Sequence, residues 1–337
     1  MMGVRGLSSY LAPRRELFDT TELRDTKVII DGNNLRFSLY RSCPGLNDCF
    51  GGDYDKFRGF VLRFFRLLLR CRVTPVIVLD GGLDKTGHKL PTVRKRLSEQ
   101  TKVAVACNSV TQTKLRVFPL FAKEVFMEVL RELGIEVHQS SFEADEVIAH
   151  LAHTSRCPVI SNDSDFYIFD VDFILLDSLD IANFSSEDTF LRCEKFNRQK
   201  MLSHYRLGSI ELLHLLAALT GNDYIPPEVF DKVFLNIKLV TKRRDMTERH
   251  RKIRSLLVYL SKERSVAAAL AKLLSFMPEA ERAKARAKVL ESVRLYEASV
   301  AAAVVSPDFS TFNGASLPTW FEAWVFIHVF CCSSSIS

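Results

Sequence analysis

The stretch that decides the fold is Lys27–Asn34, which reads KVIIDGNN. Its β-branched run is typical of a buried strand, and the run ends in an acid that is followed by glycine. Pro75–Asp80, PVIVLD, repeats the pattern and is also followed by glycine. Glycine lets the backbone turn sharply at the end of a strand. We therefore predict two buried strands that each present a carboxylate where they end.

Further apolar runs and helical patterns continue this alternation. We expect two more strands, at Ile135–His138 and Pro158–Ser161. We expect helices at Tyr54–Arg72, Leu120–Leu133 and Ala144–His153. Strands that alternate with helices indicate an α/β fold, with a central parallel sheet that helices cover on both faces. In such a sheet, ligands bind at the carboxyl ends of the strands.

The last third of the chain has a different composition. From about Glu211 onward the pattern is almost wholly helical and rich in Ala, Lys and Arg. The break at Pro226–Pro227 indicates a boundary near residue 230. We predict one domain at 1–230 and a helical C-terminal region at 231–337, with the character of a truncated or alternative terminus at its Ser-rich end.

Length and composition narrow the class of protein. The 337 residues carry 46 Lys and Arg against 40 Asp and Glu, and the net charge of +6 permits a polyanionic partner. The apolar share of 47% is that of a globular chain. The sequence has no span for a membrane and no secretory signal, and its eight cysteines have no zinc-ligand spacing. We expect a reduced intracellular compartment and no membrane partner.

Seven acids lie at predicted strand ends or beside predicted helices. They are Asp31, Asp80, Glu143, Asp145, Asp163, Asp165 and Asp223. Taken singly, each has an ordinary interpretation: Glu143 as the partner of Ser140 in a capping box, Asp163 as a helix N-cap, or Asp223 as a turn residue. Taken together, three strands of one parallel sheet bring their acids to the same edge.

Converging carboxylates define the chemistry that we expect. They repel one another unless some are protonated or cations bind between them. Oxygen ligands without matching His or Cys favour Mg²⁺ or Mn²⁺ over zinc. Two such ions, about 3.5–4 Å apart, stabilise the attacking and leaving oxygens of a phosphodiester displacement with water as the nucleophile. The sequence has no Ser–His–Asp order, P-loop or GxGxxG motif, so we expect no nucleotide cofactor.

Seven segments share their order and spacing with a known family. They are MGVRGL at Met2–Leu7, VIIDGNN at Val28–Asn34, GGDYDKF at Gly51–Phe57, VLDGG at Val78–Gly82, SFEADE at Ser141–Glu146, SNDSDF at Ser161–Phe166 and GNDY at Gly221–Tyr224. The chain resembles the flap endonuclease/XPG superfamily of structure-specific nucleases, most closely its divergent asteroid branch. The resemblance implies a PIN-like fold, with the N and I regions in 1–230 and a helical arch at about 81–120.

The resemblance also implies roles for single residues. The seven acids would together hold two divalent ions, Mg²⁺ or Mn²⁺. Gly3 would let the N-terminus approach the active site. Phe37, six residues after Asp31, would stack on a nucleobase, a contact that contributes about 1–3 kcal/mol per base. A core aromatic is the alternative interpretation of Phe37.

The arch carries the basic residues that contact the scissile phosphate in relatives. Lys85 matches the family lysine. For the family arginine, strict spacing reaches Thr92, and either Arg94 or Arg96 would need a small shift. We expect Pro91 to interrupt the arch helix, because proline breaks a helix interior.

One departure from the family bears on the substrate. The segment 221–240, GNDYIPPEVFDKVFLNIKLV, lacks the Gly-x-Gly turn with which many relatives bind duplex DNA. This favours single-stranded DNA, overhangs or other flap-like structures as substrates. The basic run Lys242–Arg254 is open to three interpretations: a phosphate grip, a nuclear-import signal or a solvated helix face.

The predicted function is thus a metal-dependent, structure-specific DNA endonuclease in DNA repair. We expect it in the nucleus, with the cytoplasm as a second location, and with repair-complex proteins as further partners. The alternative is a PIN-like scaffold with little or no catalysis, in a signalling or repair assembly. A third reading takes Asp163 and Asp165 as a phosphatase DxD pair, which alone is weak evidence.

Overall fold

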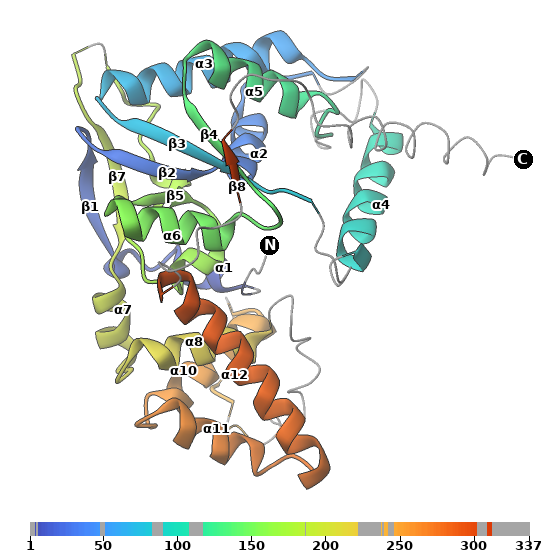
Figure 1. Cartoon of the computed structure of the whole chain (residues 1–337), viewed down its shortest axis with the longest axis vertical. Helices are drawn as coiled ribbons and strands as arrows, with labels where there is room; N and C mark the ends of the chain where they lie inside the picture. The colour runs from blue at the N-terminus through green and yellow to red at the C-terminus, as the bar shows by residue number, and fades with distance from the viewer. Residues whose placement is uncertain are drawn as a thin grey trace, which may run out of the picture.

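A mixed sheet forms the centre of the computed structural model (Figure 1). The structure describes residues 4, 6–47, 51–82, 90–107, 117–185, 187–221, 237, 239–241, 246–301 and 309–311. Among them, eight strands pair in the order β1-β7-β6-β5-β2-β3-β4-β8. The strands are β1 (Phe18–Leu23), β2 (Lys27–Asp31), β3 (Thr74–Leu79), β4 (Glu136–Ser140), β5 (Val159–Ser161), β6 (Phe173–Leu175), β7 (Leu191–Phe196) and β8 (Phe309–Thr311). The α/β fold predicted from the sequence is confirmed.

The four predicted strands form the parallel centre of this sheet. They are β2, β3, β4 and β5, and with β6 they make five neighbouring parallel strands. The antiparallel strands β1, β7 and β8 were not predicted. β1 and β7 mix buried with exposed residues, whereas β3 is buried along all but its first residue. Apolar runs therefore identified four of the five parallel strands and missed the outer antiparallel ones, while the buried strand β6 was also not predicted.

Helices cover both faces of the sheet, because alternate residues of each strand point to opposite sides. Ile30 and Ile77 pack on one side against α2 (Gly32–Ser42), α3 (Tyr54–Arg70) and α5 (Ala122–Glu132). Their strand neighbours Ile29 and Val76 pack on the other side. The helical elements there are α1 (Leu7–Leu11), α6 (Asp145–Ser155), the 3₁₀ turn η3 (Ser164–Tyr167) and α8 (Ile210–Thr220). The three helices expected from periodicity correspond to α3, α5 and α6.

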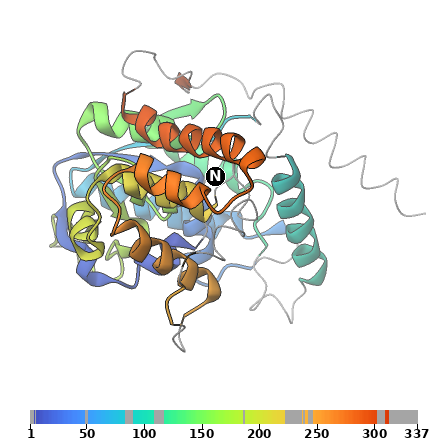
Figure 2. The ribbon, with the colours of Figure 1, turned by 90° about the horizontal axis from the view of Figure 1, so that it is seen from below.

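The helices that follow the sheet gather beneath it, as Figure 2 shows from below. They are α7 (Arg198–Tyr205), α10 (Glu248–Leu260), α11 (Val266–Leu274) and α12 (Glu279–Ala301). Their buried residues share one core cluster with α6 and α8, and the chain then returns to the sheet as β8 beside β4. The boundary near residue 230 lies outside the described residues, so the division into 1–230 and 231–337 stays a prediction.

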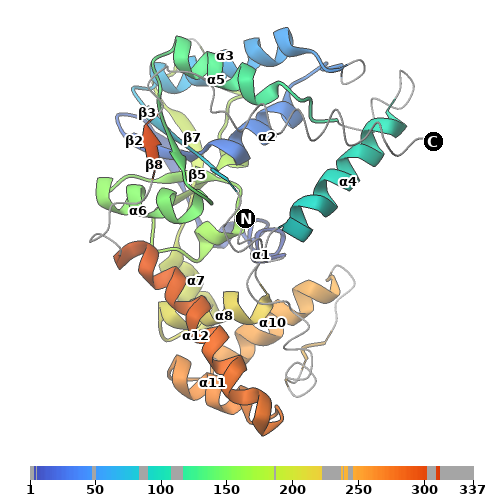
Figure 3. The same cartoon turned by 45° about the vertical axis from the view of Figure 1, so that its right-hand side comes forward.

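The segment predicted as an arch contains one long helix. α4 (Leu90–Ala106) stands apart from the sheet in both views (Figure 1, Figure 3). Pro91 lies in its first turn, so the expectation that Pro91 interrupts the arch helix was wrong. A first-turn residue has no N–H partner inside the helix, and proline is tolerated there for that reason.

A search of the helices in the described ranges for a membrane span found none of sufficient length and apolar character.

Two glycines after strand-end acids allow close packing of the chain. A Cβ at Gly32 would lie 2.6 Å from the side chains of Ile77 and Leu79. A Cβ at Gly81 would lie 1.9 Å from the carbonyl oxygen of Ser140. The Gly81 N–H donates to the carbonyl of Phe142 at 2.6 Å, which holds the end of β3 against the loop that leads into α6. Close approach, more than turning, requires glycine at these two positions.

Replacing Gly81 with alanine should therefore destabilise the protein. We expect Gly81→Ala to lower the free energy of unfolding by about 3 kcal/mol, since backbone on both sides must move. The matched control is Gly59→Ala on the exposed face of α3, where a Cβ meets nothing within 4 Å. That change should raise stability by about 0.5–1 kcal/mol. Urea denaturation of both variants measures the difference, and equal values would contradict the close-approach explanation.

Candidate metal centre

Three carboxylates meet at the carboxyl edge of the parallel strands. Asp31 ends β2, Asp163 follows β5, and Asp145 is the first residue of α6. One oxygen from each lies within 4.8 Å of the others. The three residues are 4–6% exposed. Parallel strands deliver Asp31 and Asp163 to this edge, as the sequence pattern predicted, whereas α6 brings Asp145 beside them.

Local hydrogen bonds fix the orientation of two of these acids. Asp31 caps α2: its Oδ1 accepts from the N–H of Asn34 at 2.9 Å, and its Oδ2 accepts from the Ser161 hydroxyl at 3.3 Å. Asp163 caps η3, with Oδ1 accepting from the N–H of Ser164 at 2.6 Å. Its Oδ2 is buried and has no hydrogen-bond partner among the described residues. Capping and metal ligation are therefore compatible roles, because each uses a different oxygen.

The GNN sequence after Asp31 supplies the surrounding amide groups. Asn33 donates to Oδ2 of Asp80 at 2.5 Å. Oδ1 of Asn34 accepts from the N–H of Asn162 at 3.0 Å, and the Asn162 amide donates to Asp177 at 2.7 Å. These contacts tie the loop after β5 to the start of α2. They hold in register the two loops that present Asp31 and Asp163.

The other predicted acids that the structure describes lie around this group. Asp80 is half-buried, and its Oδ1 accepts from the N–H of Ala144 at 2.9 Å. Asp165 is fully buried, and its Oδ1 accepts from the hydroxyl of Tyr296 on α12 at 3.5 Å. The charges of Asp80 and Asp165 both contribute to the raised pKa of Asp145. They thus belong to the same electrostatic cluster as the three central carboxylates.

Glu143 precedes α6 and is half-buried. The capping-box interpretation of this residue was wrong, because the N-cap of α6 is Ala144 and no side chain caps it. Instead, the Ser140 hydroxyl donates to the carbonyl oxygen of Glu143 at 2.7 Å. The carboxylate of Glu143 is therefore not engaged in a capping box and stays a predicted metal ligand.

Burial makes this cluster unfavourable as a set of free carboxylates. Burial, together with the charges of Asp80 and Asp163, raises the pKa of Asp31 to about 7 against the opposing hydrogen bond from the Asn34 N–H. Burial is also the largest cause that raises the pKa of Asp145 well above its ordinary value. The charges of Asp163 and Asp165 are the next largest causes of this rise. The pKa of Asp163 rises through burial too, although the Ser164 N–H opposes the rise. A divalent cation would replace the protons, and buried oxygen ligands with one uncommitted atom fit such an ion.

Several predicted site residues fall outside what the structure describes. These are Gly3, Lys85 and Asp223, together with the side chain of Arg96. Arg94 is exposed on α4. The roles predicted for these five residues stay predictions.

Phe37 is on the surface of α2. Its side chain is 43% exposed, so the interpretation as a core aromatic was wrong. The ring lies 5.5 Å from the ring of Phe118, and the Arg41 guanidinium lies 5.6 Å from the Phe37 ring. An exposed ring beside a cation is suited to stack on a nucleobase.

A basic pair beside the acids was not predicted from the sequence. Burial lowers the pKa of Arg36 on α2 to about 10, against the charges of Glu124, Asp80 and Asp31. Its guanidinium lies 5.2 Å from the Phe118 ring, and its buried Nε has no hydrogen-bond partner in the described part of the chain. Burial, and then the Arg36 charge, lowers the pKa of Lys123 at the start of α5. The available signal was an arginine five residues after Asp31, on the helix that this acid caps.

Comparisons with known proteins show which family the chain resembles. Residues 2–103 match the XPG N-terminal domain. Protein asteroid of Drosophila melanogaster is 33% identical over 333 residues, which cover 83% of this chain and 38% of the relative. Single-strand DNA endonuclease ASTE1 of Homo sapiens is 33% identical over 307 residues, which cover 88% of this chain and 44% of the relative. The chain thus spans less than half the length of these two relatives.

Among solved structures, the catalytic core of Rad2 in complex with a DNA substrate superposes with a TM-score of 0.49 and 17% identity. That match covers 95% of this chain and 93% of the solved one.

Proposed function

The chain belongs to the asteroid branch of the XPG-like nucleases, and we propose that it is a divalent-metal-dependent endonuclease for single-stranded DNA, overhangs and flap-like ends. The observation that carries the proposal is the buried group of Asp31, Asp145 and Asp163, with the uncommitted Oδ2 of Asp163. The alternative, a scaffold with little or no catalysis, has no use for three buried like charges.

The acid cluster would hold two ions, Mg²⁺ or Mn²⁺. Bound there, the ions would lower the pKa of a water and offset the charge of the phosphodiester. Asp31, Asp145 and Asp163 are the central ligands in this proposal. The remaining predicted ligands are Asp80, Glu143, Asp165 and Asp223.

Arg36 and Lys123 add a positive charge of the protein's own. Against the larger effect of burial, the charge of Asp80 raises the pKa of both residues, which therefore lie at the rim of the acid cluster. A phosphate that enters between this pair and the acids would meet two half-buried positive charges that are already in place. We propose that Arg36 and Lys123 position the scissile phosphate, together with Lys85 and Arg94 or Arg96 from the arch.

Two features support single-stranded substrates. The Phe37 ring is exposed beside Phe118 and Arg41, where an unpaired base could stack. The segment 221–240 has no Gly-x-Gly turn for duplex binding. The human relative is named a single-strand DNA endonuclease, and the activity in that protein's name agrees with the proposal.

Comparing labelled substrates tests the proposed function. Purified protein is mixed with a single strand, an overhang, a double flap and a plain duplex, each with Mg²⁺, Mn²⁺ or a chelator. We expect cleavage of the substrates that contain single strands, at least about tenfold slower cleavage of plain duplex, and none with the chelator. A strong preference for the double flap would contradict the single-strand assignment. No metal-dependent cleavage of any substrate would contradict the nuclease and favour the scaffold.

The proposed role of Arg36 predicts a loss of rate. We expect Arg36→Gln to lower kcat by about a hundredfold, because a preorganised charge at the phosphate is lost. Arg36→Lys should recover part of the rate, and Arg192→Gln on the exposed side of β7 should leave it unchanged. Single-turnover kinetics measure the effect, with thermal unfolding as a check of folding. Equal rates for Arg36→Gln and Arg192→Gln would contradict the assignment.

We propose the nucleus as the site of action, with the cytoplasm as a second location and repair-complex proteins as partners. The basic run Lys242–Arg254 supports this as a nuclear-import signal. Imaging of the tagged chain with this run neutralised would test the proposal, and unchanged nuclear signal would contradict it.

A further inference from the structure

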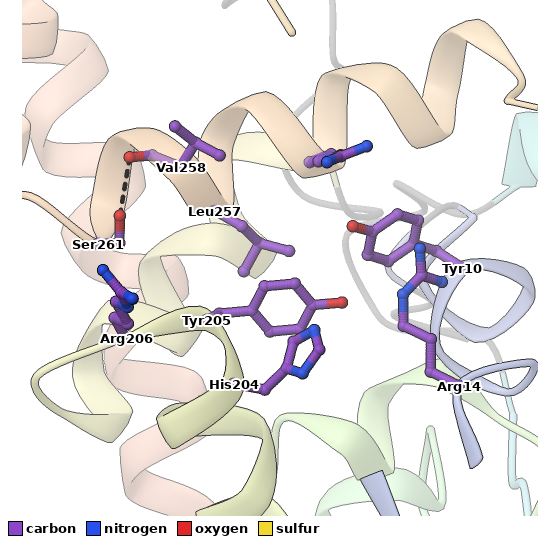
Figure 4. Close-up of a pocket in the computed structure, with 9 residues that line it drawn as sticks. Tyr10, Arg14, His204, Tyr205, Arg206, Leu257, Val258 and Ser261 are labelled. Atoms are coloured by element: carbon purple, nitrogen blue, oxygen red, sulfur yellow. Dashed lines mark hydrogen bonds between the residues drawn. The ribbon is translucent and has the colours of Figure 1, made fainter. Parts of the chain in front are cut away.

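A cavity separate from the acid cluster lies between α1, α7 and α10. It has a volume of about 400 Å³, which is in the range of small-molecule sites. Three arginines and three aromatic rings line it: Arg14, Arg206, Arg254, Tyr10, His204 and Tyr205. In Figure 4 the rings of Tyr205 and His204 occupy the centre, Tyr10 on α1 and Arg14 just after α1 lie on one side, and Arg206 lies on the opposite side. We call this cavity the Arg–Tyr pocket.

The walls of the Arg–Tyr pocket are fixed by packing between α1 and α10. The hydroxyl of Ser9 is 2.9 Å from Nε2 of His250, and the His250 ring meets the Tyr10 ring edge-on at 5.6 Å. A Cβ at Gly6 would lie 2.4 Å from the Arg249 side chain, so α10 rests directly on the start of α1. The pocket is thus formed before any ligand arrives, which lowers the entropic cost of binding.

The Arg–Tyr pocket carries an excess of positive charge, although the charge of Glu16 reaches Tyr205. No acid lines it, and none of its three arginines forms an ion pair within the described ranges. Other arginines do find acids: Arg15 pairs with Glu194, and Arg198 pairs with Asp170. Arg14 instead lies over the Tyr10 ring, with its guanidinium carbon 3.7 Å from the ring centre. Guanidinium groups from three elements around one cavity favour an anion with several oxygens, which describes phosphate.

The rings indicate what accompanies the phosphate. The His204 and Tyr205 rings are 4.7 Å apart, and Tyr205 is 6.4 Å from Tyr10. Planar rings beside guanidinium groups offer stacking faces for a nucleobase. We propose that the Arg–Tyr pocket binds a nucleoside phosphate, with the arginines on the phosphate and Tyr205 or His204 against the base.

Two ligands carry a nucleoside phosphate: a free mononucleotide and the phosphorylated end of a nucleic-acid strand. α1 contacts both α10 and η3, the turn that carries Asp165, so the pocket is joined to the acid cluster through a single short helix. The pocket does not depend on the proposed nuclease activity, since none of its lining residues belongs to the acid cluster.

Calorimetric titration of the whole chain in a chelator tests the pocket without turnover. The probes are inorganic phosphate, deoxyadenosine monophosphate, and one oligonucleotide with and without a 5′-phosphate. We expect the mononucleotide or the phosphorylated strand to bind. Arg14→Gln and Arg254→Gln should each weaken that binding about tenfold, as loss of one charge-assisted contact does. Arg15→Gln, a charge change one residue away and outside the pocket, should leave it unchanged.

The arms of the titration separate the outcomes. A tighter mononucleotide identifies the free nucleotide as the source, and a tighter phosphorylated strand identifies a strand end; both support the proposal. Inorganic phosphate binding as tightly as the nucleotide would overturn the role of the rings. Absence of binding by every probe, or equal weakening by Arg15→Gln and Arg254→Gln, would overturn the site. Because Arg254 lies on α10 and Arg14 on the α1 side, misfolding of one variant leaves the other as the test.

Discussion

Asp163→Asn should abolish metal-dependent cleavage. Asparagine keeps the Oδ1 that accepts from the Ser164 N–H, so the start of η3 is retained. It replaces the buried Oδ2, which has no partner among the described residues, with an NH₂ group that cannot bind a cation. We expect the single-turnover rate with Mn²⁺ to fall by about a thousandfold or more, because loss of a metal ligand removes the stabilisation of both reacting oxygens.

The matched control for this variant is Asp55→Asn, which removes a carboxylate from the exposed surface of α3. Its rate should equal that of the unchanged protein. A strand-binding measurement in a chelator distinguishes lost chemistry from lost binding. Cleavage by Asp163→Asn at the rate of the control would place the active site elsewhere.

The stability of the metal-free protein should fall as the pH rises. The folded-state pKa of Asp31 is about 7, against an ordinary value of 3.8. Between these values the folded state binds more protons than the unfolded state, so its stabilisation is complete at low pH and is lost as the pH rises through 7. From pH 5.5 to pH 8 we expect the Asp31 contribution to fall by roughly 2 kcal/mol of unfolding free energy.

A divalent cation should reverse this loss at high pH. Mn²⁺ at about a hundred times its dissociation constant would add roughly 2.7 kcal/mol at pH 8, and much less at pH 5.5, where protons compete for the same oxygens. Thermal unfolding at both pH values, with Mn²⁺ or with a chelator, measures the effect. Asp163→Asn should show little response to the cation. A cation effect of equal size at both pH values would contradict binding at the buried cluster.

The sequence predicted those parts of the fold that are buried on every side. β2 and β3 are almost fully apolar because helices cover both of their faces, so a plain run of Val and Ile reveals them. β1 contains Asp19 and Glu22 and mixes exposed with buried residues, which makes it resemble a loop. β8 reads Phe–Ser–Thr, so it contains no apolar run that would reveal it.

The same distinction applies to the site. Strand ends predicted that the acids converge, since parallel strands share one edge. Which acids meet most closely depends on packing that is remote in sequence: Asp165 receives a bond from Tyr296, 131 residues later. The burial of Arg36 between two helices is equally non-local, because it depends on how α5 lies against α2.

The strands at both edges of the sheet can pair only late in the synthesis of the chain. β1 pairs with β7, and β4 pairs with β8, so each pair joins segments that are more than 160 residues apart in the chain. A chain that emerges from the ribosome at about 5–20 residues per second therefore leaves β1 unpaired for roughly 8–34 s. During that interval an unpaired strand is a site for misassembly between nascent chains, and a chaperone that shields β1 would act at this stage.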